Sequence, residues 1–187
     1  MKIVNFLDFE TSSNTMAIVP EKMEDQRIGS RVLETNDEFV VPTAPLDIIK
    51  KSCHMFGSSF EGRREGAIQL IGVTRKHPIL IDYHLSICFF PTTSPKSPNC
   101  FWISPLHVFH HEEFENFSTN VIFQNYQQLI VPISRNSFEN QLYKATLLYN
   151  RYGQNIERIE KKTQLYRLNA LEHKTPYLFS HKSKSIF

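Results

Sequence analysis

Short apolar runs in the first part of the chain have the length and composition of β-strands. They occupy residues 15–19, 28–33 and 38–41, and Pro42 follows directly after the last of them. Proline removes a ladder hydrogen bond, so a strand commonly ends where it occurs. The pattern therefore predicts three short strands before residue 42.

The period of the apolar residues changes after Pro45, which suits a first helical turn. Apolar residues recur every three or four positions and form one helical face: Leu46, Ile49, Cys53 and Phe56. The opposite face is polar and carries Lys50, Lys51 and His54. Gly57 stands where a glycine commonly ends a helix, so we predict a helix from residue 45 to residue 56.

The middle of the chain returns to runs that are typical of strands, separated by turns. Residues 75–78 and the proline-rich residues 91–99 are predicted to be connections. The last two runs are close enough to form a hairpin. The predicted strands lie at residues 67–73, 79–83, 87–90, 102–109, 121–123 and 129–133.

Helical periodicity reappears after Asn136, which is predicted as an N-cap with Glu139 three residues later as in a capping box. Gly153 is predicted to end this helix, and a second helix is predicted from Asn155. The tail after Lys174 is expected to be disordered or to act as a docking peptide. The shared face of the first helix consists of Phe138, Leu142, Ala145 and Tyr149.

Taken together, the pattern predicts an α+β fold, mainly antiparallel sheet, with a helix before a glycine-rich turn and C-terminal helices. We expect residues 1–153 to form one domain and residues 154–187 to form a helical extension with a flexible tail. No run of 18 apolar residues occurs, and the N-terminus lacks a basic signal-peptide region. Three cysteines at unpaired spacing indicate free thiols in a reducing cytosol.

Charge is distributed unevenly along the chain, although the net charge is only +2. Residues 1–49 hold four basic and nine acidic side chains, whereas residues 50–76 hold six and two. Residues 77–134 hold one and four, and residues 135–187 hold ten and four. If the two basic segments meet in space they form one positive face, as in a nucleic-acid-binding protein. Ordinary solvated faces are the alternative.

Three of the six glycines lie within ten residues, at Gly57, Gly62 and Gly66. Ser58, Ser59, Arg63 and Arg64 accompany them, so this stretch has many donors for an anion such as phosphate. Its glycine spacing matches a P-loop, but Arg63 and Arg64 replace the required Lys and Ser/Thr. We therefore expect it to hold a nucleic-acid backbone and not to hydrolyse a nucleotide. The alternative is a tight turn in which Arg63 pairs with Glu61 or Glu65.

Two further groups of side chains have reactive chemistry but lack the arrangement of a catalytic or metal site. His107, His110 and His111 lack the spacing of a zinc site, so they are predicted to lie in a solvent-facing loop. Cys53 lies on the apolar helix face, where a buried thiol packs in the core and His54 points elsewhere. We expect no metal, no cofactor and no catalysis.

The helix after Asn136 offers a second polar surface. Its amide and basic side chains suit base edges and phosphates, although a helix face that simply meets water would look the same. The residues are Arg135, Asn140, Gln141 and Lys144.

Several blocks of sequence, in one order, resemble the competence transcription factor family, ComK, of Gram-positive bacteria. The resemblance covers roughly residues 14–155 and includes Phe56-Gly57-Ser58-Ser59, Cys100-x-Trp102-Ile103-Ser104 and Asn136-Ser137-Phe138-Glu139-Asn140-Gln141. It implies a cytoplasmic, nucleoid-associated activator of genes for DNA uptake and recombination. It further implies binding as cooperating dimers to paired A/T-rich promoter boxes, with contact in the minor groove.

The resemblance also implies RNA polymerase and a Clp-protease adaptor as partners, with Leu165-Tyr166-Arg167-Leu168 as a candidate docking segment. The expected function is therefore transcription activation through duplex DNA. The alternative is a non-catalytic regulatory protein whose basic faces bind an acidic protein. The predicted DNA-binding residues are Lys50, Lys51, Ser58, Ser59, Arg63, Arg64, Arg135, Asn140, Gln141 and Lys144.

Overall fold

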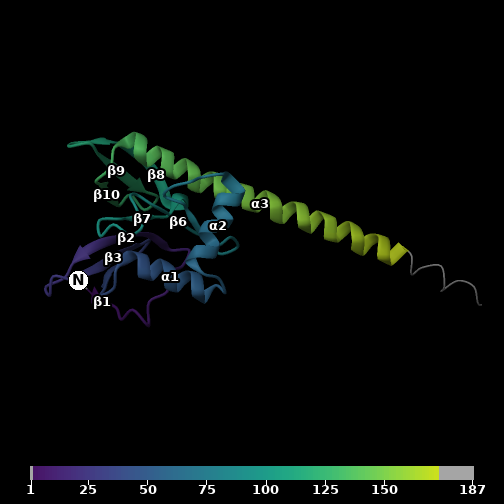
Figure 1. Ribbon diagram of the computed structural model, residues 1–187, viewed down its shortest axis with the longest axis horizontal. Helices are drawn as coiled ribbons and strands as arrows, with labels where there is room; N and C mark the ends of the chain where they lie inside the picture. The colour runs from purple at the N-terminus through teal and green to yellow at the C-terminus, as the bar shows by residue number, and fades with distance from the viewer. Residues whose placement is uncertain (1, 173–187) are drawn as a thin grey trace, which may run out of the picture. The chain divides into compact units, whose positions relative to one another are not determined.

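The computed structural model describes residues 2–172 and confirms the α+β fold (Figure 1). It divides into two units, Met1–Arg151 and Tyr152–Phe187. The predicted tail beyond Lys174 lies outside the described residues. Among those residues, no helix has both the length and the apolar content needed to cross a bilayer.

The first unit is organised around a seven-stranded sheet with the order β1-β4-β3-β2-β7-β6-β5. All neighbouring strands are antiparallel except β1 and β4. The strands predicted early and at residues 79–90 are confirmed, whereas the short β1 was missed. The bounds are β1 Lys2–Ile3, β2 Thr15–Lys22, β3 Ile28–Glu34, β4 Glu38–Val41, β5 Ile79–Asp82, β6 Ile87–Pro91 and β7 Trp102–Ile103.

A second, three-stranded antiparallel sheet has the order β10-β9-β8. The predicted hairpin is confirmed as β9 and β10, but the strand predicted at residues 102–109 is broken by the 3-10 turn Pro105–His107. His110 and His111 lie in β8, so their prediction as a solvent-facing loop was wrong. The bounds are β8 Val108–Phe114, β9 Ser118–Phe123 and β10 Gln128–Val131.

Helix α1, Pro45–Met55, confirms the predicted helix and its apolar face. Ile49 and Cys53 are fully buried. Gly57 adopts φ 68°, donating its N–H to the His54 carbonyl at 3.0 Å, while Ser58 donates to the Cys53 carbonyl at 3.0 Å. This pair of bonds is the Schellman arrangement that ends a helix at a left-handed glycine.

Helix α2, Phe60–Ile71, replaces most of the predicted glycine-rich turn and the strand predicted at residues 67–73. Ser59 caps it by accepting the Gly62 N–H at 2.9 Å, and Gly72 ends it at φ 68°. Glycines inside a helix cost about 1 kcal/mol each relative to alanine. Packing of Phe60 and Ala67 into the core offsets that cost, which the local sequence does not show.

Helix α3 is one continuous helix, Arg135–Glu172, and not two helices separated at Gly153. It starts two residues earlier than predicted, and Ser134 is the cap in place of Asn136: the Ser134 Oγ accepts the Ser137 N–H at 3.4 Å. Glu139 does not complete a capping box, because its carboxylate binds Arg135 and His111.

Both faces of the large sheet are covered, which explains why its strands are nearly continuous apolar runs. One core lies between the sheet and helices α1 and α2 and contains Ile18, Phe89 and Trp102. The other lies between the sheet, the three-stranded sheet and the start of α3, and includes Phe90 and Phe138. Figure 1 shows α1 on one side of β2 and β3, with β9, β10 and the first turns of α3 on the other.

Candidate nucleic-acid interface

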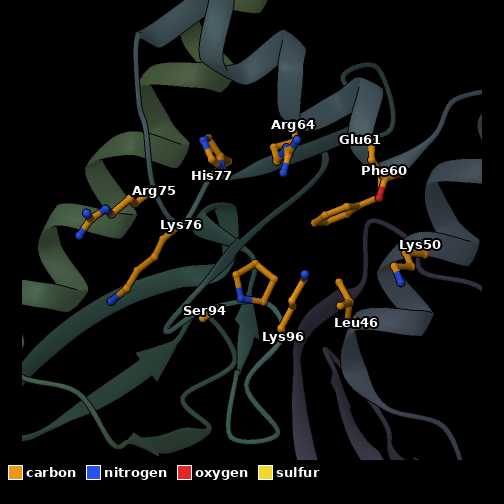
Figure 2. Close-up of a pocket in the computed structure, with 11 residues that line it drawn as sticks. Leu46, Lys50, Phe60, Glu61, Arg64, Arg75, Lys76, His77, Ser94 and Lys96 are labelled. Carbon is orange, nitrogen blue, oxygen red and sulfur yellow. The ribbon is translucent and has the colours of Figure 1, made fainter.

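A cleft of about 530 Å³ opens between α1, α2 and two connecting loops. Figure 2 shows Lys50 and Leu46 from α1 on one side of the opening and Arg75 and Lys76, from the loop after α2, on the other, with the ends of the Arg75 and Lys76 side chains pointing away from α1. The apolar part of the wall consists of Phe60, Leu46 and Pro95. The complete lining is Leu46, Lys50, Phe60, Glu61, Arg64, Arg75, Lys76, His77, Ser94, Pro95 and Lys96.

The cleft is strongly basic, because five lysine and arginine side chains line it against the single carboxylate of Glu61, a balance of +4. Lys50 lies 3.7 Å from Asp47, and Lys76 donates to the Thr92 carbonyl at 3.2 Å. Within residues 2–172, the side chains of Arg64, Arg75 and Lys96 form no hydrogen bond or ion pair. Clustered cations in a concave surface raise the local concentration of anions.

His77, on the loop after α2, lies close to basic groups from both α2 and α3. Burial lowers the pKa of His77, and the positive charges of Arg64 on α2 and Lys144 on α3 lower it further. Burial also lowers the pKa of Lys144, with Lys76 adding to the effect. The basic segment 50–76 and the start of α3 therefore lie close together, which is the condition for the single positive face considered from the charge pattern.

Two of the predicted DNA-binding residues have structural partners that use their donors. The Nζ of Lys51 donates to the carbonyls of Phe6, Leu7 and Phe9 at 2.6, 2.9 and 2.9 Å. Gln141 is only 2% exposed, and its amide donates to the carbonyls of Lys76 at 3.1 Å and Pro91 at 2.8 Å. Lys51 thus fixes the N-terminal segment, and Gln141 fixes the position of the basic loop against α3.

The serines and arginines at the start of α2 have separate positions. Ser59 is the N-cap, and the Ser58 hydroxyl donates to the Ser59 carbonyl at 3.4 Å. Arg63 turns toward the end of α1, where its guanidinium donates to the Phe56 carbonyl at 3.4 Å, and its Nε is buried. Arg64 is exposed and lines the cleft, because adjacent helical residues point in different directions.

The residues predicted to form a second surface on α3 also differ in their partners and exposure. Arg135 is half-exposed and pairs with Glu139 at 2.8 Å, and Asn140 is exposed. The Nζ of Lys144 donates to the Gln141 side chain at 3.0 Å and lies beside the basic loop. Of these residues, Lys144 is the one that joins the positive region around His77.

Four basic lining residues were not among the predicted DNA-binding residues: Arg75, Lys76, His77 and Lys96. Arg75 and Lys76 were counted in the basic segment, but the turn that holds them had no assigned role. Lys96 lies in a segment with a net negative charge, so no local signal pointed to it. Its contribution depends on the fold, which brings the loop between β6 and β7 beside α1 and α2.

The buried thiols confirm the interpretation of Cys53 as a core residue. All three cysteines are free and buried. Burial raises the pKa of the Cys53 thiol to about 11 and that of Cys88 to about 12, so the nucleophilic thiolate is disfavoured. The described part of the chain holds no group of three metal-ligating side chains.

Comparison with known proteins places the chain in a family. The family described as ComK protein matches residues 7–157. The competence transcription factor of Bacillus subtilis (strain 168) is 36% identical over 171 residues, which are 91% of this chain and 88% of that protein. No solved structure matches. The family match extends over the basic segment 50–76, the start of the second basic segment and all of the cleft, and the chain belongs to the ComK family.

Proposed function

We propose that this protein activates transcription of competence genes by binding A/T-rich duplex DNA, and that the basic cleft is its principal DNA contact. The observation that carries the proposal is the meeting of cations from α1, α2 and two loops around one concave surface, with Lys144 of α3 close enough to His77 to lower its pKa. The similarity to a competence transcription factor supports the biological role.

The size of the cleft determines which part of DNA it can hold. A space of about 530 Å³ is far smaller than a duplex, but it accommodates the ridge of one phosphate backbone. Arg64, which has no hydrogen-bond or ion-pair partner within the described residues, would then reach past the phosphates into a groove. Arginine is favoured in the narrow, strongly negative minor groove of A-tracts, so the arrangement suits A/T-rich sites.

The remaining partners follow from the family. We propose that two copies act together on paired boxes, in contact with RNA polymerase, and that the protein works in the cytoplasm. Leu165 and Tyr166 are exposed on α3, where an adaptor for a Clp protease could reach them. A regulatory protein that binds an acidic protein partner through the same cleft is the second candidate.

A binding comparison separates the two candidates. The full chain is titrated onto an A/T-rich and a G/C-rich duplex of equal length at physiological salt. Preference for the A/T-rich duplex supports the proposal. Equal, weak binding to both would favour an acidic protein partner, because nonspecific phosphate contacts do not distinguish sequence.

Adjacent lysines provide a matched test of the cleft. Lys50→Met removes a cleft charge and is expected to lower DNA affinity several-fold, with stability changed by less than about 0.5 kcal/mol. Lys51→Met removes three charge-assisted hydrogen bonds and is expected to cost roughly 2–3 kcal/mol of stability with unchanged DNA affinity. Urea unfolding and fluorescence anisotropy measure the two quantities. The reverse pattern would contradict our assignment of both residues.

His77 gives the cleft a defined pH dependence. Its lowered pKa makes it neutral near pH 7, and a bound phosphate would stabilise the protonated ring and raise that pKa. DNA binding should therefore take up a proton, and affinity should rise about three- to tenfold as pH falls from about 7 to about 5.5. His77→Asn should remove this part of the rise; an identical pH profile in both proteins would exclude His77 from the interface.

His77 has the opposite effect on the stability of the free protein, which decreases as pH falls. Because its folded pKa is below the unfolded value, the unfolded chain binds the proton first as pH falls. The free energy of unfolding therefore decreases as pH falls from the pKa of His77 in the unfolded chain to its lower pKa in the folded protein. The binding titrations must stay where circular dichroism shows the protein folded.

A further inference from the structure

A second, smaller hollow adjoins the basic cleft at the start of α1. Its volume is about 250 Å³, and three of its lining residues, Leu46, Pro95 and Lys96, also line the cleft. Figure 2 shows the side chain of Lys96 directed into the cleft from this junction. Most of the remaining lining is apolar and includes Pro45 and Pro98, so we call this space the apolar hollow.

The cleft and the apolar hollow differ in charge. The cleft is strongly basic, whereas the charged residues that line the hollow are Lys96 at the junction and Asp47. A ligand that fills both needs an anionic part and a flat, largely apolar part, and a nucleotide has both. The cleft volume of about 530 Å³ lies within the range of about 300–1,000 Å³ that is usual for small-molecule sites.

Asp47 determines which part of a nucleotide each space can hold. A carboxylate repels phosphate, so the phosphates belong in the cleft and the base belongs in the hollow. Within residues 2–172 the Asp47 carboxylate accepts no hydrogen bond, and Lys50 Nζ lies 3.7 Å from its Oδ1, which is too far for one. Two carboxylate oxygens match two adjacent N–H donors. Guanine presents such a pair at N1 and N2, whereas adenine presents one amino group beside acceptors.

The loop that forms the wall between the two spaces is held by its own hydrogen bonds. It belongs to residues 92–101, where the Ser97 N–H donates to the Ser94 carbonyl at 2.8 Å and the Cys100 N–H donates to the Ser97 carbonyl at 3.1 Å. The Cys100 side chain is buried beneath it. The wall is therefore formed in the absence of a ligand, as is usual for sites of this kind.

We propose that the cleft and the apolar hollow together bind one guanine nucleotide. Its base lies in the hollow with N1 and N2 donating to Asp47, and its phosphates lie among Lys96, Arg64 and Lys50. A regulatory consequence rests on the proposed function: the phosphates occupy cations that would hold the DNA backbone, so the nucleotide and DNA exclude each other.

Nucleotide binding is tested on the full chain without DNA. Isothermal titration calorimetry in the presence of Mg²⁺ compares GTP, ATP and tripolyphosphate, which has the phosphates but no base. GTP should bind at least about tenfold more tightly than either of the others. Equal binding of all three, or no binding of GTP at millimolar concentration, would overturn the proposal. Neither result would affect the DNA-binding proposal, which is tested with duplexes alone.

Asp47→Asn separates recognition of the base from attraction of the phosphates. It should weaken GTP binding roughly tenfold, because the amide group turns one acceptor into a donor. It should not weaken tripolyphosphate binding, because it removes a negative charge. Glu65→Gln, an exposed residue of α2 outside both spaces, should leave GTP binding unchanged. An Asp47→Asn variant with unchanged GTP affinity and native fluorescence of the single tryptophan, Trp102, would overturn the proposal.

Competition tests the consequence for DNA. GTP should displace a labelled A/T-rich duplex from the original chain at concentrations at which ATP does not. The Asp47→Asn variant should require roughly tenfold more GTP for the same displacement. GTP that binds the free chain but displaces no duplex would overturn the mutual exclusion.

Discussion

Replacing Arg64, Arg75 and Lys96 together by alanine is expected to weaken binding to an A/T-rich duplex roughly 100-fold at physiological salt. These side chains line the cleft, and within the described residues they have no partner that the substitution would strand. Each phosphate contact contributes about 0.9 to the slope of log K against log salt, so the slope should fall by about 2.7. Anisotropy titrations at four or more salt concentrations measure both the affinity and the slope.

A matched triple variant controls for the loss of net charge. Lys2, Lys22 and Arg27 are exposed in the same unit and do not line the cleft. Their replacement by alanine removes the same three charges, and it should reduce affinity by only a few-fold through the long-range field. If the two triple variants lose equal affinity, the cleft has no special role and the overall charge explains binding.

Phe138→Ala is expected to destabilise the first unit by about 3–5 kcal/mol. Phe138 is fully buried in the second core, with its ring 5.5 Å from that of Phe90 and 5.3 Å from that of His111. Removing it leaves a cavity beneath the first turns of α3 and weakens their attachment to both sheets. Urea unfolding followed by the fluorescence of Trp102, which lies in the other core, reports whether the whole unit is affected.

Tyr143→Ala is the control for this substitution, because Tyr143 is 66% exposed on the same helix. It should change stability by no more than about 0.5 kcal/mol. Equal effects of the two substitutions would mean that the start of α3 does not pack in the core. Loss of DNA binding by Phe138→Ala at a temperature where it remains folded would show that α3 positions the basic loop through Gln141.

Helices with an apolar stripe could be predicted from the sequence, and those without one could not. Helix α1 has its stripe, its proline start and its glycine end within the local sequence. Helix α2 has two internal glycines and buries mainly Phe60 and Ala67, so contacts with distant residues such as Trp102 determine it. Helix α3 continues through Gly153, since one glycine costs less than ending a long helix.

Part of the candidate interface could also be predicted. Charge segregation suggested that distant basic segments could form one positive face, and Arg64 and Lys144, which come from the two segments, both lie near His77. Charge alone could not show that Lys51 binds three carbonyls or that Gln141 is buried, because both depend on which backbone groups the fold leaves without partners. Lys96 was missed because its own segment of the sequence is not basic. The fold places Lys96 beside the basic residues of α1 and α2.

Site-specific crosslinking tests the central claim most directly. Because all three native cysteines are buried, a photoreactive group can be attached selectively to Ser94→Cys in the cleft, with Asn36→Cys in the turn before β4 as the control. If DNA binds in the cleft, the Ser94→Cys probe will crosslink a labelled A/T-rich duplex, unlabelled duplex will compete, and the control will not crosslink. Crosslinking from Asn36→Cys but not from Ser94→Cys, with both proteins binding DNA normally, would contradict it.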